Sequence, residues 1–358
     1  MRTKGDIWIS RFKEQSGWER ESLSSCCSPA GASAASCGND HLIRAGAGMR
    51  NGDASFASLD SPMSVNLLLI NQNRDGGWPY VRGASWTEPT VYAVMALLAA
   101  GENDAAARGM AWLRARQLPD GGWPPQTGFD ESNWVTALAA LVPPERLGEK
   151  AHGRAIAWLM GTTGEESTAV FRLRRWLLGA SPKKAEPAGW PWVRGTAAWV
   201  VPTALAVLAL DKEYRRRPSP AIRHRIADGR RFLMERMCVS GGWNHGSVLV
   251  YGVEGLPYPE TTGVALSAMR GVKSSATDRA IAMARKFLGE CKSADALNWL
   301  RLGLMAHGQL PADFSRPPLA CRTLIETSMD MLVAETQKGR DVLWGSWGQN
   351  TPPRKESV

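Results

Sequence analysis

The sequence of 358 residues lacks any apolar run long enough to cross a bilayer, for which about 20 consecutive apolar residues are needed. The longest candidate, residues 198–210, is too short and is better interpreted as a buried core helix. The charged start is not followed by the apolar segment of a secretory signal. These absences exclude a transmembrane-helix protein and disfavour a secreted one.

Cysteine is scarce and irregularly spaced. The six cysteines are Cys26, Cys27, Cys37, Cys238, Cys291 and Cys321. Because they form no Cys-x-x-Cys pair and no regular framework, we expect a reduced, cytoplasmic setting. A zinc site built from the three N-terminal cysteines and His41 is a disfavoured alternative, and we expect neither a metal nor a cofactor.

Acidic residues are fewer than basic ones, 34 Asp and Glu against 43 Lys and Arg, which gives a formal net charge of +9. The positive charges cluster at residues 215–217, 223–225 and 230–231. The simplest interpretation is a solvated helix face, and the alternative is attraction to an anionic lipid or a diphosphate. Peripheral membrane contact therefore stays open. No recognised module accompanies the charge, so we expect no nucleic-acid partner.

One turn recurs along the chain. Residues 75–78 read Asp-Gly-Gly-Trp, residues 120–123 repeat this string, and residues 240–243 read Ser-Gly-Gly-Trp. Gln72 and Gln117 stand three residues before the first two turns, at the end of a helix-like segment. A repeated turn at the end of a repeated helix indicates a repeat architecture.

A second element alternates with these helices. It opens with Pro or Thr and continues with small apolar residues, as in residues 86–101, 132–142, 198–210 and 259–269. Such helices, apolar nearly all round, are expected to be buried, and residues 165–179 and 295–307 are interpreted in the same way. The pattern predicts an all-α fold, a single α/α toroid of about six inner and six outer helices over residues 61–350. Residues 1–60 are expected to be a low-complexity, disordered extension, and residues 351–358 a polar tail.

The unit of helix aromatic, Gln and Gly-Gly-Trp resembles the QW repeat of the terpenoid cyclase and protein prenyltransferase superfamily. Squalene-hopene cyclase-like proteins and prenyltransferase and squalene oxidase repeat proteins share the pattern, which covers roughly residues 62–350 here. The resemblance implies structural roles for the repeat residues, in which Trp stacks and Gln caps a helix end. These residues are Gln72, Trp78, Gln117, Trp123, Trp190 and Trp243.

The catalytic motifs of the resembling families are absent. No Asp-x-Asp-Asp string is present to protonate an alkene, and no Asp-Asp-x-x-Asp string to bind a diphosphate-linked metal. No Asp-x-Cys motif with a suitably placed downstream His suggests a zinc site. A family mechanism therefore cannot be transferred residue by residue.

Acidic residues at the starts of the buried helices are the alternative catalytic groups. Glu88 and Glu260 stand beside Pro at such starts, and Asp130 occupies the matching place in the second repeat. If these starts face one mouth of the toroid, a desolvated carboxyl there can donate a proton, although each acid equally suits a helix cap. The predicted substrate-binding side chains around this mouth are Trp86, Trp134, Trp199, His245, Tyr251 and Tyr258.

Three functional hypotheses remain open at this point. The first is a toroid that binds or acts on an isoprenoid or another apolar molecule, by acid-initiated cyclisation. The second is a non-catalytic toroid that binds a lipid or a protein. The third is a carbohydrate-active α/α barrel, in which paired carboxylates at the mouth are expected.

Overall fold

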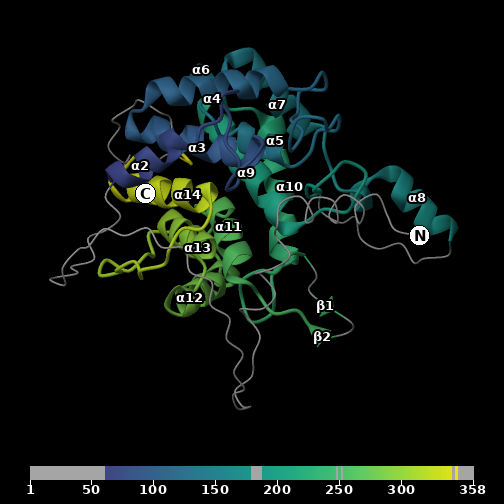
Figure 1. Cartoon of the computed structure of the whole chain (residues 1–358). Coiled ribbons are helices and arrows are strands. Elements are labelled where there is room, and N and C mark those ends of the chain that lie inside the picture. The colour runs from purple at the N-terminus through teal and green to yellow at the C-terminus, as the bar shows by residue number, and fades with distance from the viewer. Residues whose placement is uncertain (1–60, 179–187, 247–248, 251–252, 341–342, 346–358) are drawn as a thin grey trace, which may run out of the picture. The chain divides into compact units, whose positions relative to one another are not determined.

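The structure is a computed structural model that describes residues 61–178, 188–246, 249–250, 253–340 and 343–345. All of them belong to one compact unit, Asp60–Val358. The expected N-terminal extension and polar tail lie outside the described residues. The elements (Figure 1) are α2 Ser61–Ile70, α3 Thr87–Ala100, α4 Asn103–Arg116, α5 Val135–Ala139, α6 Pro144–Leu147, α7 Glu149–Met160, the 3-10 turn η1 Glu165–Ser167, α8 Ala169–Leu177, α9 Val200–Arg216, α10 Pro220–Glu235, β1 Leu249–Val250, β2 Val253–Glu254, α11 Pro259–Ala268, α12 Ser275–Glu290, α13 Ala294–Ala306 and α14 Leu324–Gln337.

The described helices form a closed inner ring. Going round it, α3 contacts α5, α5 contacts α9, α9 contacts α11, α11 contacts α13, α13 contacts α14, and α14 returns to α3. Outside this ring, α2, α4, α7, α10 and α12 each pack against one or two inner helices. The prediction of an all-α, α/α toroid is confirmed. The only strands among the described residues are β1 and β2, which form a two-residue antiparallel pair.

The inner helices are apolar nearly all round because they meet neighbours on every side. Every residue from Pro89 to Ala99 in α3 is buried, as is every residue from Val200 to Leu210 in α9. Helices α11 and α13 approach each other closely at Gly263. A Cβ atom there would lie 2.3 Å from the carbonyl carbon of Trp299, so only glycine fits.

The sequence-based assignment of the sixth inner helix is wrong. Residues 165–179 contain the short helix α8, but its apolar side chains are exposed, including Val170 at 77% and Trp176 at 63%. Three arginines interrupt the apolar residues of α8, so it cannot be buried on all sides. The sixth inner position belongs to α14, whose Ser328 is fully buried and donates to the carbonyl of Leu324 at 2.7 Å.

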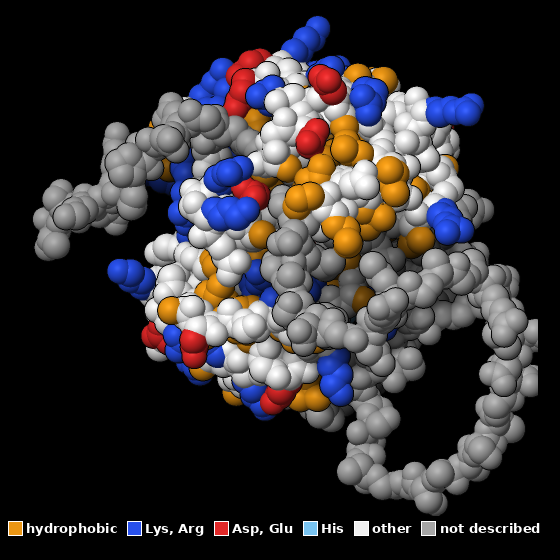
Figure 2. Space-filling model, turned by 60° about the vertical axis from the view of Figure 1, so that its left-hand side comes forward, with side chains coloured by type: hydrophobic (Ala, Val, Ile, Leu, Met, Phe, Trp, Pro, Cys, Tyr) orange, Lys and Arg blue, Asp and Glu red, His pale blue; other side chains and the backbone are white. Residues whose placement is uncertain are grey.

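The outer surface carries mixed side chains. Figure 2 shows the side that lies on the left of Figure 1, where hydrophobic side chains are exposed between scattered Lys and Arg. The outer helix α2 is labelled on that side in Figure 1 and exposes Met63 and Ile70, at 69% and 70%. No helix of the described residues is long and apolar enough to span a membrane.

The loops that lead into the inner helices are joined to one another. We call residues 79–86, 124–134, 191–199, 244–246 and 255–258 the rim. The backbone N–H groups of Thr87, Trp134, Val200 and Leu324 donate to the carbonyls of Pro125, Trp192, His245 and Tyr80, at 2.8, 3.0, 3.1 and 2.9 Å respectively. The bond from Leu324 to Tyr80 joins the last inner helix to the first loop. The rim therefore holds the N-terminal ends of the inner helices in register.

Candidate functional site

The four Gly-Trp turns share one hydrogen-bond pattern. In each, the indole N–H donates to a carbonyl of the preceding outer helix, at 2.8 Å for Trp78–Leu68, 2.7 Å for Trp123–Leu113, 2.9 Å for Trp190–Leu159 and 2.6 Å for Trp243–Leu233. The backbone N–H of each Trp donates to a threonine of the following inner helix, namely Thr90, Thr136, Thr203 and Thr262. All four indoles are buried. Through these two hydrogen bonds, each turn connects an outer helix to the inner helix that follows it.

Gln72 and Gln117 join successive outer helices. The amide of Gln117 donates to Gly121 in its own turn and to Ala151 in the first turn of α7, both at 2.8 Å. Gln72 makes the same two contacts, with Gly76 and with Ala105 of α4, both at 2.9 Å. The side chains therefore link each turn to the beginning of the next outer helix.

The turn that contains Trp190 has no Gln before it, and Arg225 of the next outer helix, α10, supplies the hydrogen-bond donor instead. Its guanidinium donates to the carbonyls of Ala188 at 2.6 Å and Thr162 at 2.9 Å, and lies 3.3 Å from the ring centroid of Trp190. Only 6% of Arg225 is exposed. The interpretation of residues 223–225 as a solvated face is therefore wrong for Arg225, because the missing Gln leaves carbonyls that a long cationic donor satisfies.

Three carboxyl groups lie at the N-terminal ends of inner helices and interact electrostatically. Glu88 lies in the first turn of α3, Glu260 in the first turn of α11, and Asp295 in the first turn of α13. Burial raises the pKa of all three, and the charges of Glu260 and Glu88 raise the pKa of Asp295 further. Each side chain nevertheless keeps some accessible surface. The three groups, called the carboxyl cluster below, are thus desolvated but reachable.

Glu88 has the best-defined surroundings in this cluster. The hydroxyl of Tyr80 donates to its Oε2 atom at 2.6 Å. Burial raises the pKa of Glu88 to about 7; the hydrogen bond from Tyr80 lowers it and the charge of Glu260 raises it. Close to neutral pH, Glu88 is therefore divided between a proton-donating and a proton-accepting form.

The predicted acids do not all reach the carboxyl cluster. Asp130 is exposed on the loop before α5, and no described contact connects it with Glu88 or Glu260. Sequence reasoning missed Asp295, although it stands in the first turn of a helix that was expected at residues 295–307. The same rule that selected Glu88 and Glu260, an acid in the first turn of an inner helix, would have found it.

Aromatic side chains from several repeats lie along the rim. Trp86 and Trp134 are each 7% exposed, whereas Trp199 is half-buried and His245 is exposed. The edge-to-face or tilted ring pairs are Tyr80–Trp86 at 5.4 Å, Trp134–Trp192 at 4.9 Å and His245–Tyr258 at 5.2 Å between centroids. The indole N–H of Trp134 has no hydrogen-bond partner. Trp192 was not predicted, and Tyr251 lies outside the described residues.

Metal binding by the carboxyl cluster finds no support in its geometry. Within the described ranges, no group of three or more His, Cys, Asp or Glu side chains is arranged to hold a metal ion. Neither Glu260 nor Asp295 has a hydrogen-bond partner there. These two side chains can therefore exchange protons with a bound molecule or with water.

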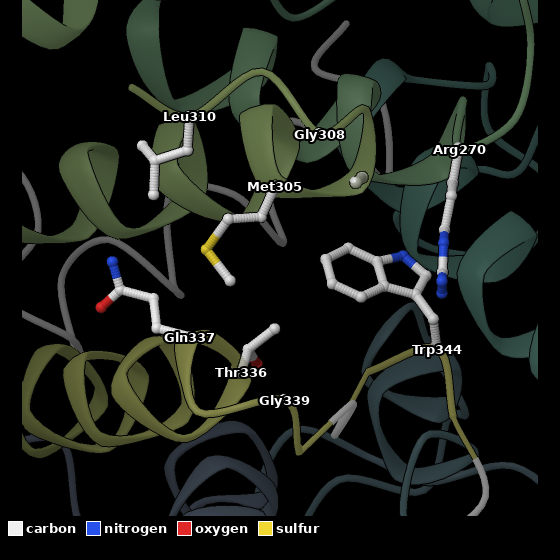
Figure 3. A pocket seen from close by; sticks show the side chains of 9 residues that line it. Arg270, Met305, Gly308, Leu310, Thr336, Gln337, Gly339 and Trp344 are labelled. Atoms are coloured by element: carbon white, nitrogen blue, oxygen red, sulfur yellow. The ribbon is translucent and has the colours of Figure 1, made fainter. Parts of the chain in front are cut away.

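A separate cavity of about 460 Å³ lies at the other ends of the inner helices (Figure 3). Met305 at the end of α13 and Thr336 at the end of α14 line it, together with Arg270 and Trp344. The Arg270 guanidinium lies 5.2 Å from the Trp344 ring centroid. The lining contains no carboxyl group, and α11, with ten residues, separates it from Glu260 by about 15 Å. The carboxyl cluster and this cavity therefore lie at opposite ends of the inner helices.

Comparison with known proteins gives a partial resemblance in sequence. No family model matches the chain. A stretch of 119 residues is 29% identical to α-onocerin synthase of Lycopodium clavatum. This stretch covers 30% of this chain and 14% of that protein. The chain is therefore similar to a terpenoid cyclase, and the match spans a small part of that relative's length.

Comparison with solved structures finds the same fold in a glucanase. A GH8 endo-β-1,4-glucanase from an Achatina fulica gut metagenomic library superimposes with a TM-score of 0.50 at 12% identity, over 80% of this chain and 100% of the glucanase. A type II terpene cyclase from Scytonema, in complex with geranylgeranyl dihydroxybenzoate, gives a TM-score of 0.38 at 14% identity, over 77% of this chain and 97% of the cyclase. The α/α toroid is thus shared with glycosidases, and fold alone does not select a reaction.

Proposed function

We propose that this chain is an acid-initiated enzyme that acts on an isoprenoid substrate, with the carboxyl cluster as its proton source. The observation that carries the proposal is the electrostatic interaction of Glu88, Glu260 and Asp295, each desolvated and each at the start of a different inner helix. Like charges in a poorly solvated site cannot all ionise together, so such a cluster retains a proton near neutral pH. Glu88 is its donor.

The proton of Glu88 has a defined direction. Because Tyr80 donates to Oε2 of Glu88, Oε2 is occupied as an acceptor and the acidic proton belongs on Oε1. Glu88 is half-buried and keeps some accessible surface for contact with a substrate. Glu260 or Asp295 then takes up a proton at the end of the reaction, so that the cluster returns to its starting charge.

The rim supplies the second requirement of this chemistry. Carbocations formed after protonation are stabilised by aromatic faces through cation–π attraction. Trp86 and Tyr80 form one ring pair, and Tyr80 is also hydrogen-bonded to Glu88. Trp134 and Trp192 form another ring pair on the rim. The similarity to α-onocerin synthase supports an isoprenoid as the substrate class.

Product analysis tests the proposal directly. Purified protein is incubated with squalene, geranylgeranyl diphosphate and shorter prenyl diphosphates, and the organic extracts are analysed by mass spectrometry. We expect a new product whose formation falls about 100-fold or more in Glu88→Gln, because a general acid contributes at least about that factor. Glu260→Gln and Asp295→Asn should also reduce it.

The control is Glu145→Gln, which changes an exposed acid on α6 and should leave the product unchanged. Turnover that survives in Glu88→Gln would sink the acid assignment. Saturable isoprenoid binding with no product from any substrate would instead favour a non-catalytic lipid-binding toroid.

Glycoside hydrolysis is the second candidate, because a glucanase shares the α/α toroid and hydrolysis of a glycosidic bond uses two carboxyl groups. Release of reducing sugar from a β-1,4-glucan, lost in Glu88→Gln and Glu260→Gln, would favour this reaction. A chain that releases no sugar but converts an isoprenoid excludes it.

A further inference from the structure

Tyr92 is a buried side chain with an unpaired hydroxyl at the carboxyl cluster. It lies on α3 four residues after Glu88, so the two side chains project from the same face of the helix. Tyr92 is 3% exposed, and no described residue hydrogen-bonds its hydroxyl. An unbonded hydroxyl that was fully buried would count among the unsatisfied buried polar atoms of the described residues, and the Tyr92 hydroxyl does not. The small accessible part of Tyr92 therefore includes its oxygen atom.

The charges of all three acids act on the hydroxyl of Tyr92. Burial raises the pKa of Tyr92 well above its usual value, and the charges of Glu88, Asp295 and Glu260 raise it further. Tyr92 consequently remains a neutral phenol, which can donate a hydrogen bond and accept others. Its ring is buried on the inner helix α3, so the hydroxyl is a fixed donor within electrostatic range of the three acids.

We infer that Tyr92 contacts the substrate, and that the end of the substrate that reaches the carboxyl cluster carries a hydroxyl or ether oxygen. This inference rests on the proposed function and specifies its substrate class: an isoprenoid alcohol or ether, in preference to a hydrocarbon. A hydrocarbon in this place would displace water and leave the Tyr92 hydroxyl unsatisfied, which is unfavourable. An oxygen atom accepts the hydrogen bond, and it is also the atom that Glu88 can protonate.

The resulting step is balanced without any further reagent. The O–H bond of Glu88 breaks as its proton moves to the substrate oxygen, which Tyr92 holds. The adjacent C–O bond then breaks and both of its electrons stay on oxygen, so an alcohol or water leaves and a carbocation remains. After the chain has reacted with this cation, a carboxylate of the cluster removes a proton from a neighbouring carbon and an alkene forms.

The Tyr92→Phe variant isolates the hydroxyl. It keeps the ring and breaks no hydrogen bond within the described residues, so its melting temperature should equal or exceed that of the wild type. The probes are farnesol and β-farnesene, which have the same carbon chain with and without oxygen. Their binding is measured by equilibrium dialysis with mass-spectrometric quantification. The matched control is Tyr214→Phe, the same change on a half-buried tyrosine of α9.

We expect wild-type protein to bind farnesol about tenfold more tightly than β-farnesene, the effect of one hydrogen bond. Tyr92→Phe should abolish this preference by weakening farnesol binding alone, whereas Tyr214→Phe should retain it. Equal binding of both probes, or a preference that persists in Tyr92→Phe, overturns the inference while isoprenoid binding itself stands. Failure to bind either probe overturns the substrate class. An oxygen preference that depends on Tyr92, with turnover unaffected in Glu88→Gln, would reject the acid mechanism and keep this inference.

Discussion

The hydroxyl of Tyr80 donates a hydrogen bond of 2.6 Å to Oε2 of Glu88. Tyr80 belongs to the first loop of the rim, and its backbone carbonyl accepts the N–H of Leu324 at the start of α14. The loop that carries the hydrogen bond is thus fixed by the helix that closes the inner ring. The protonation of the proposed acid therefore depends on a contact between the first and last parts of the toroid.

Tyr80→Phe should move the alkaline limb of the pH–rate profile to higher pH. The hydrogen bond from Tyr80 lowers the pKa of Glu88, so its removal raises that pKa and keeps the acid protonated further into the alkaline range. The profile of kcat/KM reports the free enzyme and is the measurement needed. Tyr214→Phe should leave it in place. A shift to lower pH in Tyr80→Phe would contradict the assignment.

Glu260→Gln should shift the same limb in the opposite direction. The charge of Glu260 raises the pKa of Glu88, and its removal lets Glu88 lose its proton at lower pH. The rate at the optimum also falls if Glu260 serves as the final base. An unchanged limb would show that the two groups titrate independently. Glu145→Gln, which changes an exposed acid on α6, is the reference for this comparison.

Glu88→Gln should stabilise the protein at pH 8 while it removes activity. The pKa of Glu88 in the folded chain, about 7, exceeds its unfolded value of 4.5. The charged form is therefore disfavoured in the fold, and stability is lost as pH rises from about 4.5 through about 7. We expect the variant to be more stable by about 1–3 kcal/mol at pH 8 and by nearly nothing at pH 4, since partial exposure reduces the effect. Thermal unfolding at both pH values measures this, and equal differences at pH 4 and pH 8 would contradict it.

Much of the fold could be predicted because its determinants are local. A helix that is apolar on all sides must be enclosed by others, and the Gly-Gly-Trp turn repeats where each outer helix ends. Helix α14 does not show the apolar pattern of an inner helix, because it buries polar side chains. These side chains form hydrogen bonds within the helix, as Ser328 does with the carbonyl of Leu324. The prediction that places residues 165–179 in the core fails because the three arginines of α8 are incompatible with burial on all sides.

The site was harder to predict because it is assembled from residues far apart in the chain. Glu88 and Glu260 were accessible to reasoning, since both stand beside Pro in a first turn. Asp295 follows Ser293, which caps α13 through its side chain, and no Pro marks that start. The contact between Tyr80 and Glu88 depends on the path of a loop, and no periodicity encodes it.

Gln117→Leu should destabilise the toroid without altering its chemistry. The substitution leaves the carbonyls of Gly121 and Ala151 without the amide that now bonds to both, at a cost of about 1–3 kcal/mol. Gln72→Leu should cost at least as much, because Gln72 also accepts a hydrogen bond from Arg108 at 3.0 Å. Melting temperatures lower by about 1–2 °C per kcal/mol are expected for a chain of this size. A variant with the melting temperature of the wild type would mean that the glutamine does not join the outer helices.

Arg225→Met should be among the most damaging substitutions on the outer ring. Burial lowers the pKa of Arg225 to about 10, so it is still charged at neutral pH, and its guanidinium satisfies the carbonyls of Ala188 and Thr162. Methionine fills similar space but leaves both carbonyls buried without a donor, at about 1–3 kcal/mol each. Arg225→Lys should recover only part of this loss, since an ammonium group lacks the planar fork. Arg223→Met, two residues earlier on the exposed face of α10, is the matched control. If both methionine variants lose equal stability in urea unfolding, Arg225 does not replace the missing glutamine of the turn that contains Trp190.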